Sequence, residues 1–277
     1  MNKSKKKITA DILSYFILIS GSLMMIVPFL WMISTSLKTA DATFVLPPKF
    51  IPDHITLNNY KNVINSFPIL RFLFNSIFVS VTITLGQLLI CSMAAYVFAR
   101  IDFKGRNALF LIYLGTLMIP SQATLTPQYI LMNHFGWVNT YKALILPGMF
   151  SAFGTFLMRQ YFLTIPKSLE EAAFIDGASH LKVFFRIIMP LSKPGLATLT
   201  ITSFMESWNS FLWPLIITSD DKHITLPLAL TRMQGRWHTD YNSLMAGTLI
   251  TVIPILIVYL LAQKQFIKGI TMTGIKG

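Results

Sequence analysis

The chain has 277 residues, of which 53% are hydrophobic and only 12% are charged, so it is too apolar for an average soluble domain. Its formal net charge of +12 does not indicate a nucleic-acid partner, because the basic residues are not clustered on a soluble domain with interleaved aromatic residues. Cys91 is the one cysteine, which excludes an intrachain disulfide and a cysteine-based metal site. We therefore predict an all-α polytopic membrane protein that binds membrane lipid and no nucleic acid.

The apolar runs predict six transmembrane helices in a single domain that covers residues 1–277. About 20 apolar residues span a bilayer, and the run from Ile12 to Ile33 is uncharged over 22 residues. The third run contains Pro120 and Pro127, so the limit between helix and external turn stays open there. The expected spans are residues 12–33, 72–99, 107–130, 143–160, 195–219 and 243–263, with a polar loop at 161–194.

Lysine and arginine are distributed unequally between the two sides of these spans. The N-terminus, the loop after the second span, the 161–194 region with Arg159, and the C-terminal tail hold 15 of them, whereas the other loops hold 8. The positive-inside rule then places both termini and the 161–194 loop in the cytoplasm.

The polar segment from Pro166 to Pro194 is dense in helix signals. Ser168 followed by Glu171 predicts a capping box, so a short helix is expected to begin near Leu169. Gly177 is expected to end that helix, and Ser179 to cap a second one. The apolar stripe expected on the second helix consists of Leu181, Phe184, Phe185 and Ile188.

Small side chains on the first of these helices favour a docking function. Ala172, Ala173 and Gly177 would allow the surface of another protein to approach the backbone closely. An ordinary amphipathic pair of surface helices is the alternative interpretation.

This segment resembles a known motif. Glu171-Ala172-Ala173, then Gly177, then Ile187 and Pro190 resemble the EAA loop of binding-protein-dependent ABC importer permeases. The resemblance implies the type I ABC importer permease fold, with a cytoplasmic coupling-helix loop that docks on an ATPase through residues 166–190. The docking residues that it implies are Glu171, Ala172, Ala173, Asp176, Gly177, Ile187 and Pro190.

The resemblance covers most of the chain and points to the carbohydrate-uptake branch, specifically its maltose-type second permease subunit. It rests on Leu57-Asn58-Asn59-Tyr60, Asn75-Ser76, residues 94–100, residues 208–215 and the terminal residues 268–277. It implies a second homologous permease subunit, two ATP-binding subunits and an extracytoplasmic sugar-binding protein in a bacterial plasma (inner) membrane. The external loops, especially Asp220 to Tyr241 with Trp237 and His238, would contact the binding protein or be solvated connections. The tail would touch the ATPases or anchor the chain at the membrane surface.

The sequence contains no pattern for catalysis of its own. A phosphate-binding Gly-x-x-x-x-Gly-Lys-Ser/Thr motif is missing, so ATP would be bound by a partner subunit, and this chain is expected to be neither an enzyme nor a cofactor-binding protein. The five histidines lack His-x-x-x-His spacing, so no metal site is expected.

Glu206 is the strongly charged residue deep in a predicted span. A carboxylate at bilayer depth costs roughly 2.5–3.5 kcal/mol, so it should face protein or a water-filled path. With Trp208 and Asn209 it predicts a polar and aromatic substrate path for a hydroxyl-rich ligand, or else an anchor between helices near a gate. A neutral mono- or oligosaccharide is the expected substrate, because no basic residue lies deep within a span.

Three other functions fit the sequence less well. A secondary transporter would normally need ion-coupling groups within the membrane and an internal repeat. A membrane-embedded enzyme would need a carboxylate pair or a histidine cluster at membrane depth. A purely structural scaffold would leave the docking segment without a purpose.

Overall fold

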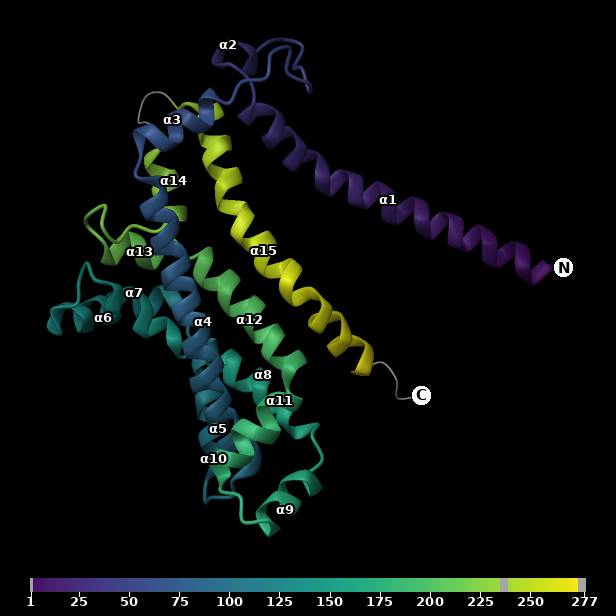
Figure 1. The fold of residues 1–277 in the computed structure, drawn as a ribbon, viewed down its shortest axis with the longest axis vertical. Helices are drawn as coiled ribbons and strands as arrows, with labels where there is room; N and C mark the ends of the chain where they lie inside the picture. The colour runs from purple at the N-terminus through teal and green to yellow at the C-terminus, as the bar shows by residue number, and fades with distance from the viewer. Residues whose placement is uncertain (1, 235–238, 274–277) are drawn as a thin grey trace. The chain divides into compact units, whose positions relative to one another are not determined.

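The computed structural model describes residues 2–234 and 239–273, and this part of the chain is built from helices and their connecting loops (Figure 1). The chain divides into two compact units, which are taken one at a time. Its helices are α1 (Asn2–Ser36), α2 (Ala40–Thr43), α3 (Asn58–Ser66), α4 (Ile69–Arg100), α5 (Arg106–Gly115), α6 (Ser121–His134), α7 (Tyr141–Ile145), α8 (Ala152–Leu163), α9 (Ser168–Ile175), α10 (His180–Val183), α11 (Met189–Leu191), α12 (Lys193–Trp208), α13 (Leu212–Ile217), α14 (Leu226–Arg232) and α15 (Tyr241–Thr273). Short 3-10 helices cover Thr116–Met118 and Leu146–Met149, and a π-helical turn covers Phe184–Ile188.

The first unit joins the chain up to Ile69 with residues 230–252. Most side chains of α1 from residue 11 onward are exposed, as expected of an apolar helix that faces lipid. Its C-terminal end is held by two amides. Asn59 donates to the carbonyls of Ser36 and Lys38, and Asn242 donates to those of Thr35 and Lys38, at distances of 2.8–3.1 Å. These bonds satisfy carbonyls that the end of a helix leaves without a partner.

The second unit is organised around α4. Its core cluster takes residues from α4, α8 and α12, from the link after α8 and from the second half of the 161–194 loop. These residues are Cys91, Ala95, Tyr96, Ala99, Met158, Phe162, Ile165, Val183, Phe184, Ile188 and Leu199. In Figure 1 the loop that carries α9 lies at one end of this unit, and α6, α7 and α13 lie toward the other.

The predicted spans agree with the structure in part. Among the residues that the structure describes, four helical stretches are long and apolar enough to cross a membrane. They match the predicted first, second, fourth and sixth spans: Asp11–Ser36, Ile69–Arg100, Tyr141–Leu163 and Tyr241–Leu261. The predicted third span is a helix pair, Arg106–Met118 and Ser121–His134, bent by 99°. The bend falls at Pro120, which lacks a backbone N–H and disfavours helix at the residue before it.

The predicted fifth span, residues 195–219, is not one continuous helix. α12 stops at Trp208 after 16 residues, and α13 starts at Leu212. Pro214 is tolerated in the first turn of a helix but not in its interior, so a new helix has to begin just before it. The count of six spans therefore stays a prediction.

The loop helices begin and end largely where the sequence predicts. α9 ends at Ile175 with Asp176 as its C-cap, and the chain leaves the helix through Gly177, which has a φ of +75°. The N–H of Gly177 bonds the carbonyl of Phe174, and the N–H of Ala178 bonds that of Ala173, which together form a Schellman motif. The Ser179 hydroxyl caps α10 by accepting from the N–H of Lys182.

Two details of this prediction are wrong. The capping box does not form, because the backbone is already helical at Lys167 and Ser168 lies inside the helix, where its hydroxyl caps nothing. The apolar stripe is also different: Phe184 and Ile188 are buried, but Leu181 and Phe185 are exposed. The π-helical turn at Phe184–Ile188 changes the helical period and so rotates the buried face.

Candidate functional site

The predicted docking residues fall into two groups. Glu171, Ala172, Asp176, Gly177 and Pro190 are exposed, so they are available to a partner. Ala173 and Ile187 pack against the core cluster of the second unit, so they support the loop from within. The exposed group is bordered by apolar side chains of α9, of which Ile175 is 86% exposed and Leu169 and Phe174 are less so. We call the segment from Ser168 to Pro190 the docking loop.

A buried ion pair that sequence reasoning missed fixes the docking loop to α4. Arg100 Nε lies 2.6 Å from Glu170 Oε1, and the two side chains are only 4% and 6% exposed. The N–H is not aligned for a hydrogen bond, so the contact is an ion pair. Arg100 also donates to the carbonyls of Phe162 and Ile165, at 2.6 Å each.

The position of Glu170 on α9 explains its burial. Glu170 precedes Ala173 by three residues, so the two share one helix face, and Ala173 faces the core. Burial raises the pKa of the Glu170 carboxyl, and the Arg100 guanidinium acts in the opposite direction. The guanidinium thereby offsets part of the cost of burying a carboxylate.

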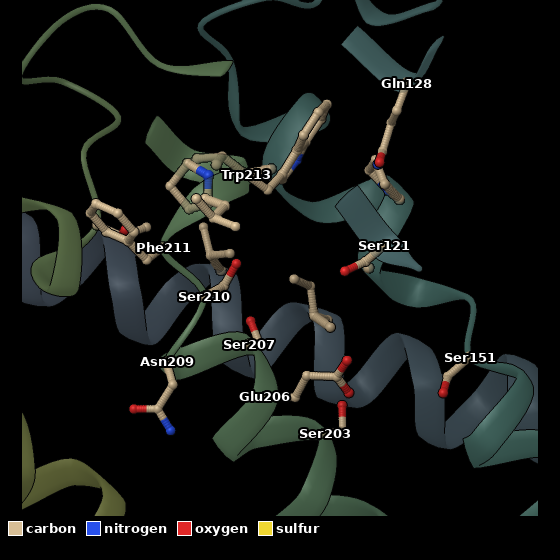
Figure 2. Close-up of a pocket in the computed structure, with 18 of the residues that line it drawn as sticks. Ser121, Gln128, Ser151, Ser203, Glu206, Ser207, Asn209, Ser210, Phe211 and Trp213 are labelled. Carbon is tan, nitrogen blue, oxygen red and sulfur yellow. The ribbon is translucent and has the colours of Figure 1, made fainter. Parts of the chain in front are cut away.

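A cavity of about 590 Å³ lies in the second unit, lined by α4, α6, α12, α13 and the loops beside them (Figure 2). Among its lining side chains Glu206 is the charged one, and lysine, arginine and histidine are missing from the described lining. The other polar side chains are Gln87, Ser121, Thr124, Gln128, Ser151, Ser203, Ser207, Asn209, Ser210 and Thr225.

Three hydroxyls of this lining have no hydrogen-bond partner among the described residues: those of Ser203, Ser207 and Thr225. A buried polar group without a partner costs about 1–3 kcal/mol, so a ligand or solvent that bonds these hydroxyls would recover that energy. Figure 2 shows the hydroxyl of Ser203 beside the Glu206 carboxylate, with Ser207 on the next turn. This side of the cavity therefore offers several donors and acceptors to a polyhydroxylated molecule.

The predicted substrate-path residues are only partly brought together. Glu206 and Asn209 line the cavity, although the Asn209 amide bonds the carbonyl of Met205 and points away from Glu206 (Figure 2). Trp208 does not line the cavity. It is 1% exposed and its ring stacks on Phe204, with centroids 5.5 Å apart. One helical residue is turned about 100° from the next, so neighbours in sequence face different sides.

Other aromatic residues supply the rings that Trp208 was expected to supply. Phe150, Phe211 and Trp213 line the cavity, and the indole N–H of Trp213 donates to the carbonyl of Ala143 at 2.9 Å. This bond fixes the ring, and a fixed aromatic face beside hydroxyl groups suits a sugar ring.

The loop that follows α13 is anchored at one edge of this cavity. The Asn75 amide donates to the carbonyls of Lys222 and Ile224, and the hydroxyl of Tyr141 donates to Asn75 Oδ1. Ser76 accepts from the N–H of Leu226 at 2.6 Å. The Asn75-Ser76 pair therefore holds the loop that carries Thr225. Trp237 and His238 of the predicted external loop, and residues 274–277 of the tail motif, lie outside the described residues.

The chain is similar along most of its length to permeases of sugar transport systems. It is 38% identical over 245 residues to the arabinooligosaccharides transport system permease protein AraQ of Halalkalibacterium halodurans, covering 88% of this chain and 86% of that protein. It is 36% identical over 277 residues to the trehalose/maltose transport system permease protein MalG of Thermococcus litoralis, covering 96% and 99%. It is 34% identical over 267 residues to the sn-glycerol-3-phosphate transport system permease protein UgpE of Escherichia coli, covering 94% and 95%.

The fold has a solved counterpart. The structure resembles a chain of a bacterial ABC transporter involved in the import of the acidic polysaccharide alginate, with a TM-score of 0.83, 26% sequence identity and coverage of 93% of this chain and 96% of that one. Residues 86–271 also match the family described as the binding-protein-dependent transport system inner membrane component. This chain therefore belongs to that family of multi-pass membrane permeases.

Proposed function

We propose that this chain is the transmembrane permease subunit of an ATP-driven, binding-protein-dependent sugar importer and forms half of its translocation path. The observation that carries the proposal is the docking loop, whose exposed face presents Glu171, Ala172 and Gly177 on a short helix tied to α4. A family permease needs such a surface to receive energy from another subunit.

The proposed assembly contains a second homologous permease subunit, two ATP-binding subunits and an extracytoplasmic sugar-binding protein. ATP is bound and hydrolysed by the partner subunits, and this chain carries no cofactor, metal or catalytic residue. Both termini and the 161–194 loop are cytoplasmic, in line with the excess of lysine and arginine there. An alginate importer of the same fold has been crystallised with an alginate pentasaccharide-bound periplasmic protein.

The proposed substrate is a neutral mono- or oligosaccharide. The relatives are named for arabinooligosaccharides, for trehalose and maltose, and for glycerol phosphate. Membership of the family therefore does not decide between a neutral and an anionic substrate. The cavity favours the neutral class, because its described lining carries one carboxylate and no cation. A phosphate or a uronate would lack a counter-charge there and would be repelled by Glu206.

Reconstitution tests this function. The chain is co-purified with candidate permease and ATPase partners and placed in vesicles with the binding protein, and sugar-stimulated ATP hydrolysis is measured. Wild type should capture the ATPase, and Glu171→Ala and Gly177→Asp should weaken that capture. Lys104→Ala, an exposed change outside the docking loop, is the control and should behave as wild type. Uptake that needs an ion gradient and no ATP would replace this proposal with a secondary transporter.

The cavity is tested separately in the same vesicles. Glu206→Ala should impair sugar uptake while assembly and ATPase capture stay unchanged. Wild-type uptake by a stably expressed Glu206→Ala variant would remove Glu206 from the substrate path.

A further inference from the structure

We propose that the ion pair of Arg100 and Glu170, called the joint below, makes the docking loop move as one body with α4 and α8. Arg100 and Glu170 are then positioning residues for energy coupling. The proposal rests on the proposed function, since it concerns how motion of the loop reaches the helices that line the cavity.

The joint connects three elements at one point. Arg100 is the last residue of α4, and its guanidinium contacts Glu170 in the first turn of α9. The same guanidinium bonds the carbonyls of Phe162, in the last turn of α8, and Ile165, in the link between α8 and α9. One side chain therefore fixes the end of α4, the end of α8 and the start of α9 relative to one another.

The attachment of α9 depends strongly on this contact. Glu170 is the one buried residue in the eight residues of α9. Ala173 adds a partly buried methyl group, and Phe174 adds an edge contact with His180, whose ring nitrogen lies 3.4 Å from the Tyr96 hydroxyl. A helix with so few apolar contacts is held mainly by its ion pair, so loss of the pair should let α9 move independently of the spans.

Neither member of the pair is available to a partner protein, because both side chains are almost fully buried. Changes at these positions therefore act on coupling only through the placement of their exposed neighbours. Glu171 follows Glu170 directly and belongs to the exposed docking face. This separates a positioning role from a docking role: docking variants should lose the ATPase, whereas joint variants should keep it and lose the transfer of motion.

The test uses the full complex in vesicles, with its ATPase subunits and binding protein. Two quantities are measured together: the amount of ATPase that co-purifies with the chain, and the number of sugar molecules taken up per ATP hydrolysed. Glu170→Gln removes the charge with little change of shape, and Arg100→Gln removes the guanidinium together with its bonds to the carbonyls of Phe162 and Ile165. They should leave co-purification near wild type and lower the uptake-to-hydrolysis ratio about fivefold or more, the range typical of a lost coupling interaction.

Asp102→Asn is the matched control. It breaks the ion pair in which Asp102 Oδ1 lies 2.6 Å from Arg106 Nη1. Asp102 is 88% exposed, and the pair joins two residues only four positions apart in the sequence. Its uptake-to-hydrolysis ratio should stay within about twofold of wild type, because exposed pairs contribute little. Glu170→Asp keeps the charge and should recover part of the ratio that Glu170→Gln loses.

The outcomes separate this proposal from the proposed function. If wild type shows no ATP-dependent uptake, the proposed function fails. If wild type transports, and Glu170→Gln and Arg100→Gln have the same uptake-to-hydrolysis ratio as the Asp102→Asn control, the positioning role of the pair is refuted while the proposed function stands. If Glu170→Gln and Glu170→Asp both fail to assemble, the pair serves folding and the positioning role is likewise refuted.

Discussion

The packing of α12 on α8 makes Gly195→Ala a sharp test of the structure. A Cβ at residue 195 would lie 2.7 Å from Cγ and 2.8 Å from Cδ2 of the Tyr161 ring, and 3.2 Å from Tyr161 Cβ. The Cβ of Tyr161 is fixed by the backbone, and its Cγ moves only when χ1 changes, so the contact is relieved only by a new rotamer of the whole ring or by a shift of the helix. Overpacking of this kind costs about 1–3 kcal/mol, and the better helix propensity of alanine returns up to about 1 kcal/mol. The expected net loss is about 1–2 kcal/mol.

Thermal unfolding of the purified chain in detergent measures this loss. For a chain of this size it should lower Tm by roughly 2–6 °C. Gly21→Ala in α1 is the control: a Cβ there meets nothing within 4 Å, so Tm should be unchanged or slightly higher. Combining Gly195→Ala with Tyr161→Ala should cost less than the two changes separately, with a coupling of at least about 0.5 kcal/mol. An unchanged Tm for Gly195→Ala, or strict additivity in the double variant, would refute the close approach of the two helices.

Three further predictions concern the docking loop, the cavity and the loop after α13. Gly177→Ala should weaken ATPase capture about tenfold, because alanine at a φ of +75° costs about 1–2 kcal/mol, whereas Gly177→Asn should lose less, as measured by pull-down titration. Ser203→Ala should raise the KM for sugar uptake a few-fold without changing Tm, since its hydroxyl has no partner among the described residues; an unchanged KM would remove Ser203 from the path. Hydrogen bonds from Asn139 and His223 lower the pKa of the Asp220 carboxyl from 3.8. The ionised carboxylate should therefore keep the loop ordered at neutral pH, and this order should weaken only as the pH falls through the lowered pKa. Amide-exchange protection of residues 219–225 measures this, and Asp220→Asn should abolish the pH dependence.

The parts of the fold that sequence reasoning predicted correctly depend on local signals. Gly177 ends α9 and Ser179 caps α10 because each needs only its own backbone geometry and the next few residues. The first, second and sixth spans follow from the length of their apolar runs. The break between α12 and α13 also has a local signal, because Pro214 is tolerated in the first turn of a helix but not in its interior.

The parts that sequence reasoning missed depend on contacts between distant residues. Glu170 lies in the first turn of α9, where the helix dipole alone favours a carboxylate. Only the position of Arg100, 70 residues earlier in the sequence, makes it a buried anchor. Trp208 was placed in the substrate path because it lies next to Asn209, yet its ring belongs to the core. In an apolar chain the hydrophobic pattern barely distinguishes the lipid-facing side of a helix from its buried side, so the direction of one side chain cannot be predicted from the pattern.

The buried polar residues of this chain divide by what they bond. The amides of Asn59, Asn75 and Asn242 and the guanidinium of Arg100 donate to backbone carbonyls at helix ends and in loops, so their polarity is used within the fold. The hydroxyls of Ser203, Ser207 and Thr225 bond no described residue, and these three residues line one cavity. Thr35 and Ser92 also carry buried hydroxyls without a described partner, but neither lines this cavity, where three such hydroxyls occur together. Because Glu206 and Trp213 line the same cavity, the substrate path is sought there and not on the face of α12 that carries Trp208.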